Sequence, residues 1–247
     1  MIKIRHVSKK FDDMVALRDI NLEIKDGETI AIIGGSGSGK STLLRLLIGL
    51  IKPTEGEILI DGKDIAHMNE AELDKVRLHM GMVFQYSALF DSMTVGENVA
   101  FGLVEHTKKT KAEIRAIVQE KLKQVGLPDV ADLMPNELSG GMKKRVGLAR
   151  AIAFEPSIIF YDEPSSGLDP LMTAKIDHLI IEMQRTLHVT SIVVTHDMAS
   201  ACRIANRIAM IYEGELIAFA PVDVFQKLQD PRIQAFFHTL KLARSVS

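Results

Sequence analysis

A glycine-rich run between an apolar strand and a helix constrains this chain more than any other feature. The run GGSGSGKST occupies residues 34–42, follows ETIAII and fits the pattern G-x-x-x-x-G-K-[ST]. Glycines let the backbone turn so that successive N–H groups face one anion, and the N-terminus of the following helix adds partial positive charge. The run therefore predicts a phosphate-binding loop within an α/β fold.

The pattern assigns a role to each residue of the loop. Lys40 is expected to reach the β- and γ-phosphates of a nucleotide, and the Ser41 hydroxyl is expected to ligate Mg²⁺. The other expected nucleotide contacts come from Gly34, Gly35, Ser36, Gly37, Ser38, Gly39 and Thr42.

An acidic pair ends a second apolar strand. The run SIIFYDEP places Asp162 and Glu163 at the end of this predicted strand. A strand-end aspartate is the second Mg²⁺ anchor of a phosphate-loop site, and the following glutamate could orient an attacking water. A solvated acidic strand end is the alternative, which the upstream phosphate loop disfavours.

Strand and helix patterns alternate towards both ends of the chain. Strands are expected at 2–7, 19–24, 28–33, 57–61, 81–84, 157–161, 191–195, 207–212 and 214–219. Helices are expected at about 40–50, 70–78, 111–125, 140–154, 171–187 and 197–204. This alternation predicts a largely parallel sheet with helices packed on it.

The middle of the chain departs from this alternation. Residues 86–154 have mostly helical patterns and contain the charged stretch EHTKKTKAEIRAIVQEKLKQ. Such a stretch is typical of a solvated helix surface, and a nucleic-acid-binding patch is the alternative. We therefore expect residues 86–154 to form a helical insert in the α/β core.

Composition disfavours several classes of protein. The net charge is −2, with 25% charged residues, so no basic field favours nucleic acid as the main partner. Cys202 is the single cysteine, which rules out an intrachain disulfide. The N-terminus MIKIRHVSKKF lacks the apolar core of a signal peptide, and no run reaches the roughly 18 apolar residues of a membrane span. We expect any membrane role to depend on a partner.

A second helix start with anion-binding character follows the sequence LSGG at residues 138–141. This sequence resembles the signature motif of ABC transporter ATPase subunits. With the phosphate loop and the acidic strand end, the chain resembles that family over essentially its whole length. The resemblance implies a P-loop NTPase (RecA-like) α/β core with a mostly parallel sheet, an N-terminal antiparallel β region and a helical signature subdomain. The implied single domain, 1–247, has core segments 1–85 and 155–220, the signature subdomain 86–154 and a helical tail 221–247.

The resemblance also explains why one chain would carry two anion-binding helix starts. In that family two cassettes face each other head to tail as a homodimer. Each ATP, with its Mg²⁺, lies between the phosphate loop of one chain and the signature helix of the other. Ser139, Gly140 and Gly141 would then complete the neighbour's site as an electrostatic clamp, and Asp169 in SSGLDP would cross the dimer interface.

Four further residues match family positions one by one. Phe11 resembles the aromatic residue that stacks on adenine, although a core position is the alternative, and Val15 would pack beside the ribose. Gln85, which closes the strand GMVFQ, resembles the Q-loop glutamine that contacts Mg²⁺ or water. His196, after the strand SIVVT, resembles the switch histidine that contacts the γ-phosphate.

One departure from the family pattern narrows the subfamily. Most family signatures continue with Gln where this chain has Met142, whose thioether barely hydrogen-bonds. The runs ELSGGMKKRVGLARAIA, FQYSALFDSMTVGENVAF and DPRIQAFF resemble the ATPase of MCE-type lipid transporters, which include the bacterial system that maintains outer-membrane lipid asymmetry. This implies phospholipid transport driven from the cytoplasmic face of the inner membrane. The ATPase of a small-solute importer and a soluble, non-transport ABC ATPase are the alternatives.

Two segments are expected to contact other elements. Residues 85–99 would line a groove that receives a helix of an integral membrane permease, or would be ordinary core residues under a loop. An MCE-type lipid-binding protein is a further implied partner, and nucleic acid is not expected. In the tail, Ile233, Phe236, Phe237 and Leu240 share one helix face, which would pack on its own domain or on the neighbouring chain.

Overall fold

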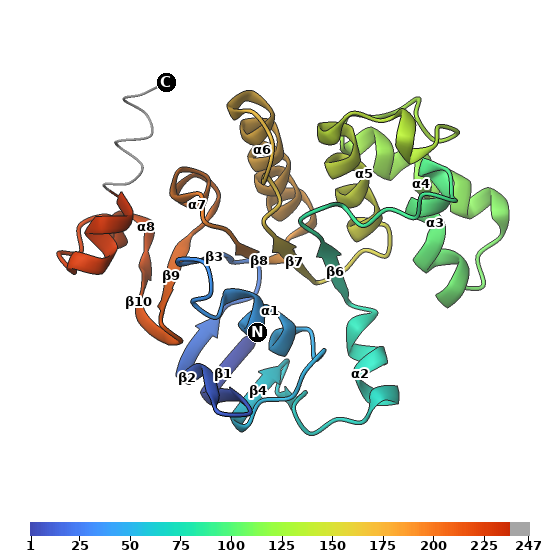
Figure 1. Ribbon diagram of the computed structural model, residues 1–247. Helices are drawn as coiled ribbons and strands as arrows, with labels where there is room; N and C mark the ends of the chain where they lie inside the picture. Colours follow the sequence, from blue (N-terminus) through green and yellow to red (C-terminus); the bar gives the residue numbers. More distant parts are fainter. Residues whose placement is uncertain (238–247) are drawn as a thin grey trace. The chain divides into compact units, whose positions relative to one another are not determined.

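The computed structural model describes residues 1–237 of the chain (Figure 1). It divides into two compact units. Unit 1 comprises Met1–Asp74 and the chain from Thr190 onward, and unit 2 comprises Lys75–Val189. Helix α2 (Glu70–Arg77) spans the point where the chain passes from one unit to the other. The predicted subdivision at residues 86–154 and 221–247 stays a prediction.

Parallel strands form the centre of unit 1. Strand β3 (Thr29–Ile33) pairs in parallel with β8 (Thr190–Val194) on one side and β9 (Arg207–Tyr212) on the other. Strand β10 (Glu215–Pro221) then pairs antiparallel with β9. Every residue of β3 and β8 is buried, which is why both strands read as continuous apolar or small-residue runs without alternation.

A second, antiparallel sheet lies in the N-terminal part of unit 1, as the family resemblance implied. Its strand order is β2-β1-β4-β5, with β1 (Ile2–Phe11), β2 (Met14–Ile24), β4 (Glu55–Ile60) and β5 (Lys63–Asp64). The predicted strands 2–7 and 19–24 were too short. Strands β1 and β2 form one long hairpin whose register shifts at several points, and His6 and Asp19 adopt positive φ there. These irregularities break the alternation that marks a strand in sequence.

Three short helices complete the regular structure of unit 1, and residues 231–237 are also helical. They are α1 (Lys40–Leu47), α7 (Met198–Ile204) and α8 (Val222–Phe225). Helix α1 ends before the predicted residue 50, since Gly49 adopts a φ of 74°.

The C-terminal helical segment packs on unit 1 of its own chain. Ile233 is 1% exposed and joins a cluster with β3, α7, β9 and Phe225, and Phe236 and Phe237 pack against that cluster. The sequence left open whether this apolar face covers its own domain or a neighbour, and for these three residues the structure places it on its own chain. Leu240 lies outside the described residues.

Truncation of Ile233 should therefore destabilise unit 1. We expect Ile233→Ala to lower the free energy of unfolding by about 2–5 kcal/mol, because it removes buried methyl groups and leaves a cavity. Val224→Ala is the matched control, since Val224 is 45% exposed and its truncation should change stability by about 0.5 kcal/mol or less. Urea unfolding would measure both, and equal effects would contradict the docking of segment 231–237.

Unit 2 combines two parallel strands with a group of helices. Strand β6 (Met80–Val83) pairs in parallel with β7 (Ile158–Asp162). The helices are α3 (Val95–His106), α4 (Lys111–Gln124), the 3₁₀ turn η1 (Pro135–Glu137), α5 (Gly140–Ile152) and α6 (Pro170–Leu187). Helices α3, α4 and α5 pack against one another, and α5 also packs against β6 and α6.

None of the helices within residues 1–237 combines the length and the apolarity that crossing a membrane requires.

Candidate nucleotide-binding and hydrolysis site

The phosphate loop of unit 1 joins the buried strand β3 directly to helix α1, as predicted. Gly34 (φ 154°) and Gly39 (φ 110°) adopt backbone conformations that favour glycine. A Cβ atom at Gly39 would lie 2.6 Å from Leu17 Cδ2, and one at Gly34 would collide with the Ile211 carbonyl oxygen. The loop therefore takes its path because glycine lets it pass close to β2 and β9.

Lys40 folds back over this loop. It is 9% exposed, and its Nζ donates hydrogen bonds to the carbonyl oxygens of Gly34 (2.9 Å) and Gly35 (2.8 Å). Helix α1 begins at Lys40. Its N-cap residue is Gly39, which has no side chain to accept hydrogen bonds from the first N–H groups of the helix. A cation and an uncapped helix start thus lie together, which is an anion-binding arrangement. Ser41 is exposed and Thr42 half-buried in the same first turn.

His196 lies at the same edge of the sheet as the start of the phosphate loop. It is exposed and follows β8, which runs parallel to β3, so both connections begin at the carboxyl ends of neighbouring strands. Thr195 donates its N–H to the Ile32 carbonyl oxygen (3.1 Å), and its hydroxyl accepts from the Asp197 N–H (3.0 Å). These bonds fix the backbone on both sides of His196.

Phe11 and Val15 lie near the turn of the β1–β2 hairpin and are 38% and 37% exposed. The alternative of a core position for Phe11 was wrong. The Lys9 ammonium lies 4.9 Å from the centre of the Phe11 ring. Both side chains therefore offer an accessible apolar surface on the β1–β2 hairpin, whose strand β2 also approaches Gly39.

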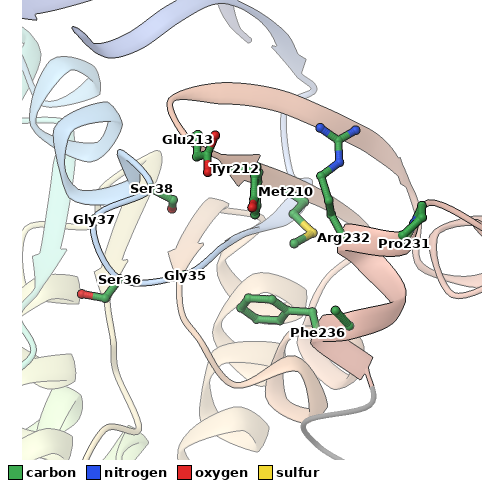
Figure 2. Close-up of a pocket in the computed structure, with 11 residues that line it drawn as sticks. Gly35, Ser36, Gly37, Ser38, Met210, Tyr212, Glu213, Pro231, Arg232 and Phe236 are labelled. Atoms are coloured by element: carbon green, nitrogen blue, oxygen red, sulfur yellow. The ribbon is translucent and has the colours of Figure 1, made fainter. Parts of the chain in front are cut away.

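A pocket of about 560 Å³ lies alongside the phosphate loop (Figure 2). Residues 35–38 of the loop form one side, and the C-terminal segment supplies Arg232 and Phe236 on the other. Arg232 is held in an ion pair with Asp230 (2.6 Å), and its hydrogen bonds lower the pKa of Asp230 to about 2. The sequence did not predict this approach, because it depends on how the tail docks.

Three predicted site residues of unit 2 lie together at the carboxyl ends of β6 and β7. The register pairs Val83 with Tyr161, so Gln85 on one side and Asp162 and Glu163 on the other follow adjacent parallel strands. Gln85 Nε2 donates to the Ser166 hydroxyl (3.4 Å). Glu163 adopts a φ of 47°, which turns the chain sharply after the strand.

Sequence reasoning missed Lys144, a buried lysine beside these three residues. It lies on α5, is 6% exposed, and donates from Nζ to the main-chain oxygens of Gln85 and Glu163, the latter at 3.4 Å. Burial lowers the pKa of the Lys144 ammonium, while the charges of Glu163 and Asp162 act to raise it. A pair of lysines after the signature was the available signal, but nothing in the sequence separates Lys144 from Lys143.

The predicted signature forms the N-terminus of α5. Ser139 caps the helix by accepting the Met142 N–H (3.3 Å), and Ser139 and Gly140 are both exposed. A Cβ at Gly140 would meet nothing within 4 Å, whereas one at Gly141 would collide with Met172. This helix start therefore faces outward at Gly140 and packs on α6 at Gly141.

Asp169 has a role within its own chain. Its carboxylate caps α6 by accepting the N–H groups of Leu171 (2.9 Å) and Met172 (3.0 Å). The side chain is exposed, and its expected position across a dimer interface stays a prediction.

An apolar surface follows β6. Tyr86 is 86% exposed and Phe84 and Phe90 are each more than 40% exposed, so these three are not core residues. The Phe90 ring lies 4.8 Å from that of Phe101 on α3. Buried Asn98 shapes the connection by donating to the carbonyl oxygens of Phe90, Met93 and Thr94.

Comparison with known proteins agrees with this geometry. The family model described as ABC transporter matches residues 17–166 of the chain. The chain therefore belongs to the family of ABC transporter ATP-binding subunits. It is accordingly an ATPase whose hydrolysis of ATP is coupled to transport, and cassettes of this family dimerise and work with membrane permeases.

Two relatives bear on cargo. The chain is 43% identical over 236 residues to the intermembrane phospholipid transport system ATP-binding protein MlaF of Haemophilus influenzae, covering 96% of this chain and 89% of that protein. It is 42% identical over 237 residues to the probable ribonucleotide transport ATP-binding protein mkl of Mycobacterium leprae. That match covers 96% of this chain and 68% of the mycobacterial protein.

A solved structure confirms the fold class. The dimeric ATP-binding cassette MJ0796, in a post-hydrolysis state bound to ADP and phosphate, superposes with a TM-score of 0.83 at 37% identity. The match covers 90% of this chain and 99% of that one. The P-loop α/β architecture expected from the sequence is therefore established.

Proposed function

We propose that this ABC subunit is the motor of a bacterial phospholipid transporter of the inner membrane. The observation that carries the proposal is the similarity to MlaF over 96% of the chain, combined with a complete set of phosphate-binding and strand-end acidic residues. The reaction is the hydrolysis of ATP to ADP and phosphate.

Unit 1 supplies the groups that hold the nucleotide. Lys40 and the N-terminal N–H groups of α1 bind the phosphates, because a cation and a helix N-terminus both stabilise negative charge. Phe11 stacks on adenine and Val15 packs beside the ribose, which their exposure on β1 and β2 permits. The other phosphate contacts come from Gly34, Gly35, Ser36, Gly37, Ser38, Gly39, Ser41 and Thr42.

Magnesium fits the donor set of the chain. The hydroxyl of Ser41, the amide oxygen of Gln85 and the carboxylate of Asp162 are hard oxygen ligands of the kind Mg²⁺ prefers. The ion would shield the negative charge of the phosphate oxygens. These three residues are our proposed metal ligands.

Hydrolysis needs a base and a group that senses the γ-phosphate. Glu163 is proposed to orient the attacking water and to accept its proton, since it directly follows Asp162 at the strand end. His196 is proposed to contact the γ-phosphate from the edge where the phosphate loop begins. Gln85 is proposed to contact the metal or the water and to report to the membrane partner.

The active form is proposed to be a homodimer with shared sites. The exposed N-terminus of α5 at Ser139 and Gly140 is suited to a ligand that another chain holds, and Gly141 supports it from within. Asp169 is proposed to reach the neighbour as well. The isolated chain would then be slow until ATP draws two copies together.

The membrane partner is proposed to contact the apolar surface that follows β6. Residues 85–99 carry the exposed Tyr86 and Phe90, which suit the apolar face of an amphipathic permease helix. The chain would thus lie on the cytoplasmic face of the inner membrane, held by the permease. An MCE-type lipid-binding protein is the further proposed partner.

Reconstitution of the intact complex tests the cargo. The tagged chain is purified in detergent with the permease that accompanies it and is placed in vesicles containing labelled phospholipid. We expect ATP-dependent phospholipid transfer, and we expect none in a complex carrying Glu163→Gln.

Ribonucleotide is the second candidate cargo, because the name of the mycobacterial relative specifies it. The same vesicles, loaded with labelled ribonucleotide instead of labelled lipid, provide the comparison. ATP-dependent ribonucleotide movement without phospholipid transfer would overturn the phospholipid proposal and leave the ATPase assignment intact.

A further inference from the structure

Helix α5 holds the segment that follows β6 through three residues on one side. Lys144 donates to the Gln85 carbonyl oxygen, and Arg150 donates to those of Ser87 (2.7 Å) and Ala88 (2.6 Å). Between them, a Cβ at Gly147 would lie 3.6 Å from Ser87 Cβ, so the helix and the segment are in close contact. The helix that begins at the signature thus fixes the Q-loop main chain.

The main chain held in this way is in an unusual conformation. Ser87 (φ 62°), Ala88 (φ 44°) and Glu163 (φ 47°) all adopt the left-handed region, which L-residues rarely occupy without support. Lys144 contacts the Glu163 carbonyl oxygen as well as that of Gln85. One ammonium therefore joins the two chain segments that leave β6 and β7.

The partners of Lys144 are informative. A buried ammonium needs hydrogen-bond acceptors to offset its lost hydration. Lys144 Nζ donates to the main-chain oxygens of Gln85 and Glu163. The ammonium thus acts on the backbone from which those two side chains project.

We propose that Lys144 is a positioning residue for ATP hydrolysis. Its ammonium fixes the backbone at Gln85 and Glu163 so that their side chains hold a reactive geometry. Because Lys144 lies on α5, it also ties that geometry to the helix whose N-terminus carries Ser139. The proposal rests on the roles proposed above for Gln85 and Glu163.

Lys144→Met tests the proposal, since methionine keeps most of the volume and removes the charged donor. We expect kcat of the intact complex to fall by roughly 10- to 100-fold, because small misplacements of reacting groups cost that much, while KM for ATP stays within about threefold. Lys144→Arg restores a permanent cation and should recover part of the lost kcat. A residue that merely supported folding would lower thermal stability without this division between kcat and KM.

Lys121→Met is the matched control. Lys121 on α4 is a second buried lysine of unit 2, 2% exposed and paired with Glu155 (3.4 Å), and neither residue belongs to the proposed site. Its loss should change stability and leave kcat of the folded complex near that of the wild type.

The possible results separate this inference from the proposed function. If Glu163→Gln abolishes hydrolysis but folded Lys144→Met keeps a kcat within twofold of the wild type, the positioning role is overturned alone. If Glu163→Gln itself hydrolyses ATP normally, the role proposed for Glu163 fails, and the positioning role that rests on it fails with it. Should Lys144→Met not fold, Lys144→Gln, which keeps a neutral donor, replaces it with the same two deciding outcomes.

Discussion

Replacement of Glu163 by glutamine is expected to slow ATP hydrolysis by roughly 10²- to 10⁴-fold, the usual contribution of a general base. The change keeps the size of the side chain and removes both the base and its negative charge. Binding of Mg-ATP should not weaken, because one carboxylate that repels the triphosphate is gone. The variant should therefore accumulate as a closed dimer holding two ATP molecules, which size exclusion with Mg-ATP would detect.

Glu155→Gln is the matched control for this variant. Glu155 follows helix α5 of unit 2 and has nearly the same positive φ, 51° against 47°, but its side chain is 79% exposed and pairs with Lys121. The same change of atoms there should leave hydrolysis unaltered.

Asp162→Asn should differ from both, since loss of a metal ligand would impair closure as well as hydrolysis. Native turnover by Glu163→Gln, or no closed dimer, would move the catalytic role elsewhere, and His196 would be tested next.

The phosphate loop shows where sequence alone was sufficient. A strand at 28–33 and a helix from residue 40 were predicted, and β3 and α1 confirm both. The reason is local. Every residue of β3 is buried, so its sequence is uniformly apolar or small, and the loop conformation is available mainly to glycine at positions such as Gly34 and Gly39.

Helix α3 shows a signal that was present but not used. Val95–His106 was expected only as part of a helical region, because two glycines and three valines lower its intrinsic propensity. Its start is marked by a capping box, in which Thr94 accepts from the Glu97 N–H and Glu97 accepts from the Thr94 N–H. Thr-x-x-Glu before an apolar run would have predicted the boundary.

Other features could not be predicted because they depend on tertiary contacts. Residues 143 and 144 are both lysines, so the sequence does not distinguish them. Only the placement of α5 beside β6 and β7 buries Lys144 and leaves Lys143 half-exposed. The docking of segment 231–237 is similar. An apolar face was evident from the spacing of Ile233, Phe236 and Phe237, but a face does not specify what covers it.

Lys40→Ala is the second change with a large expected effect, and it should sharply lower nucleotide affinity and hydrolysis together. The ammonium is proposed to neutralise the β- and γ-phosphates, and hydrogen bonds to charged groups are each worth about 1.5–3 kcal/mol. The loss of one or two such bonds predicts a weakening of ATP affinity by at least roughly tenfold. The remaining loop amides cannot replace the cation, so the transition state loses at least as much as the bound substrate.

The structure also specifies what this variant must be checked for. Lys40 holds the carbonyl oxygens of Gly34 and Gly35 through its Nζ, so its removal also loosens the loop before any nucleotide binds. A melting temperature close to the wild-type value would show that the fold remains.

Lys52→Ala is the control, since exposed Lys52 also donates to a main-chain oxygen, that of Met68 (3.3 Å), outside the loop. Titration with a fluorescent nucleotide and an ATPase assay would follow. Wild-type affinity and turnover in folded Lys40→Ala would contradict the assignment of residues 34–42 as the phosphate site, whereas loss in Lys40→Ala but not in Lys52→Ala would support it.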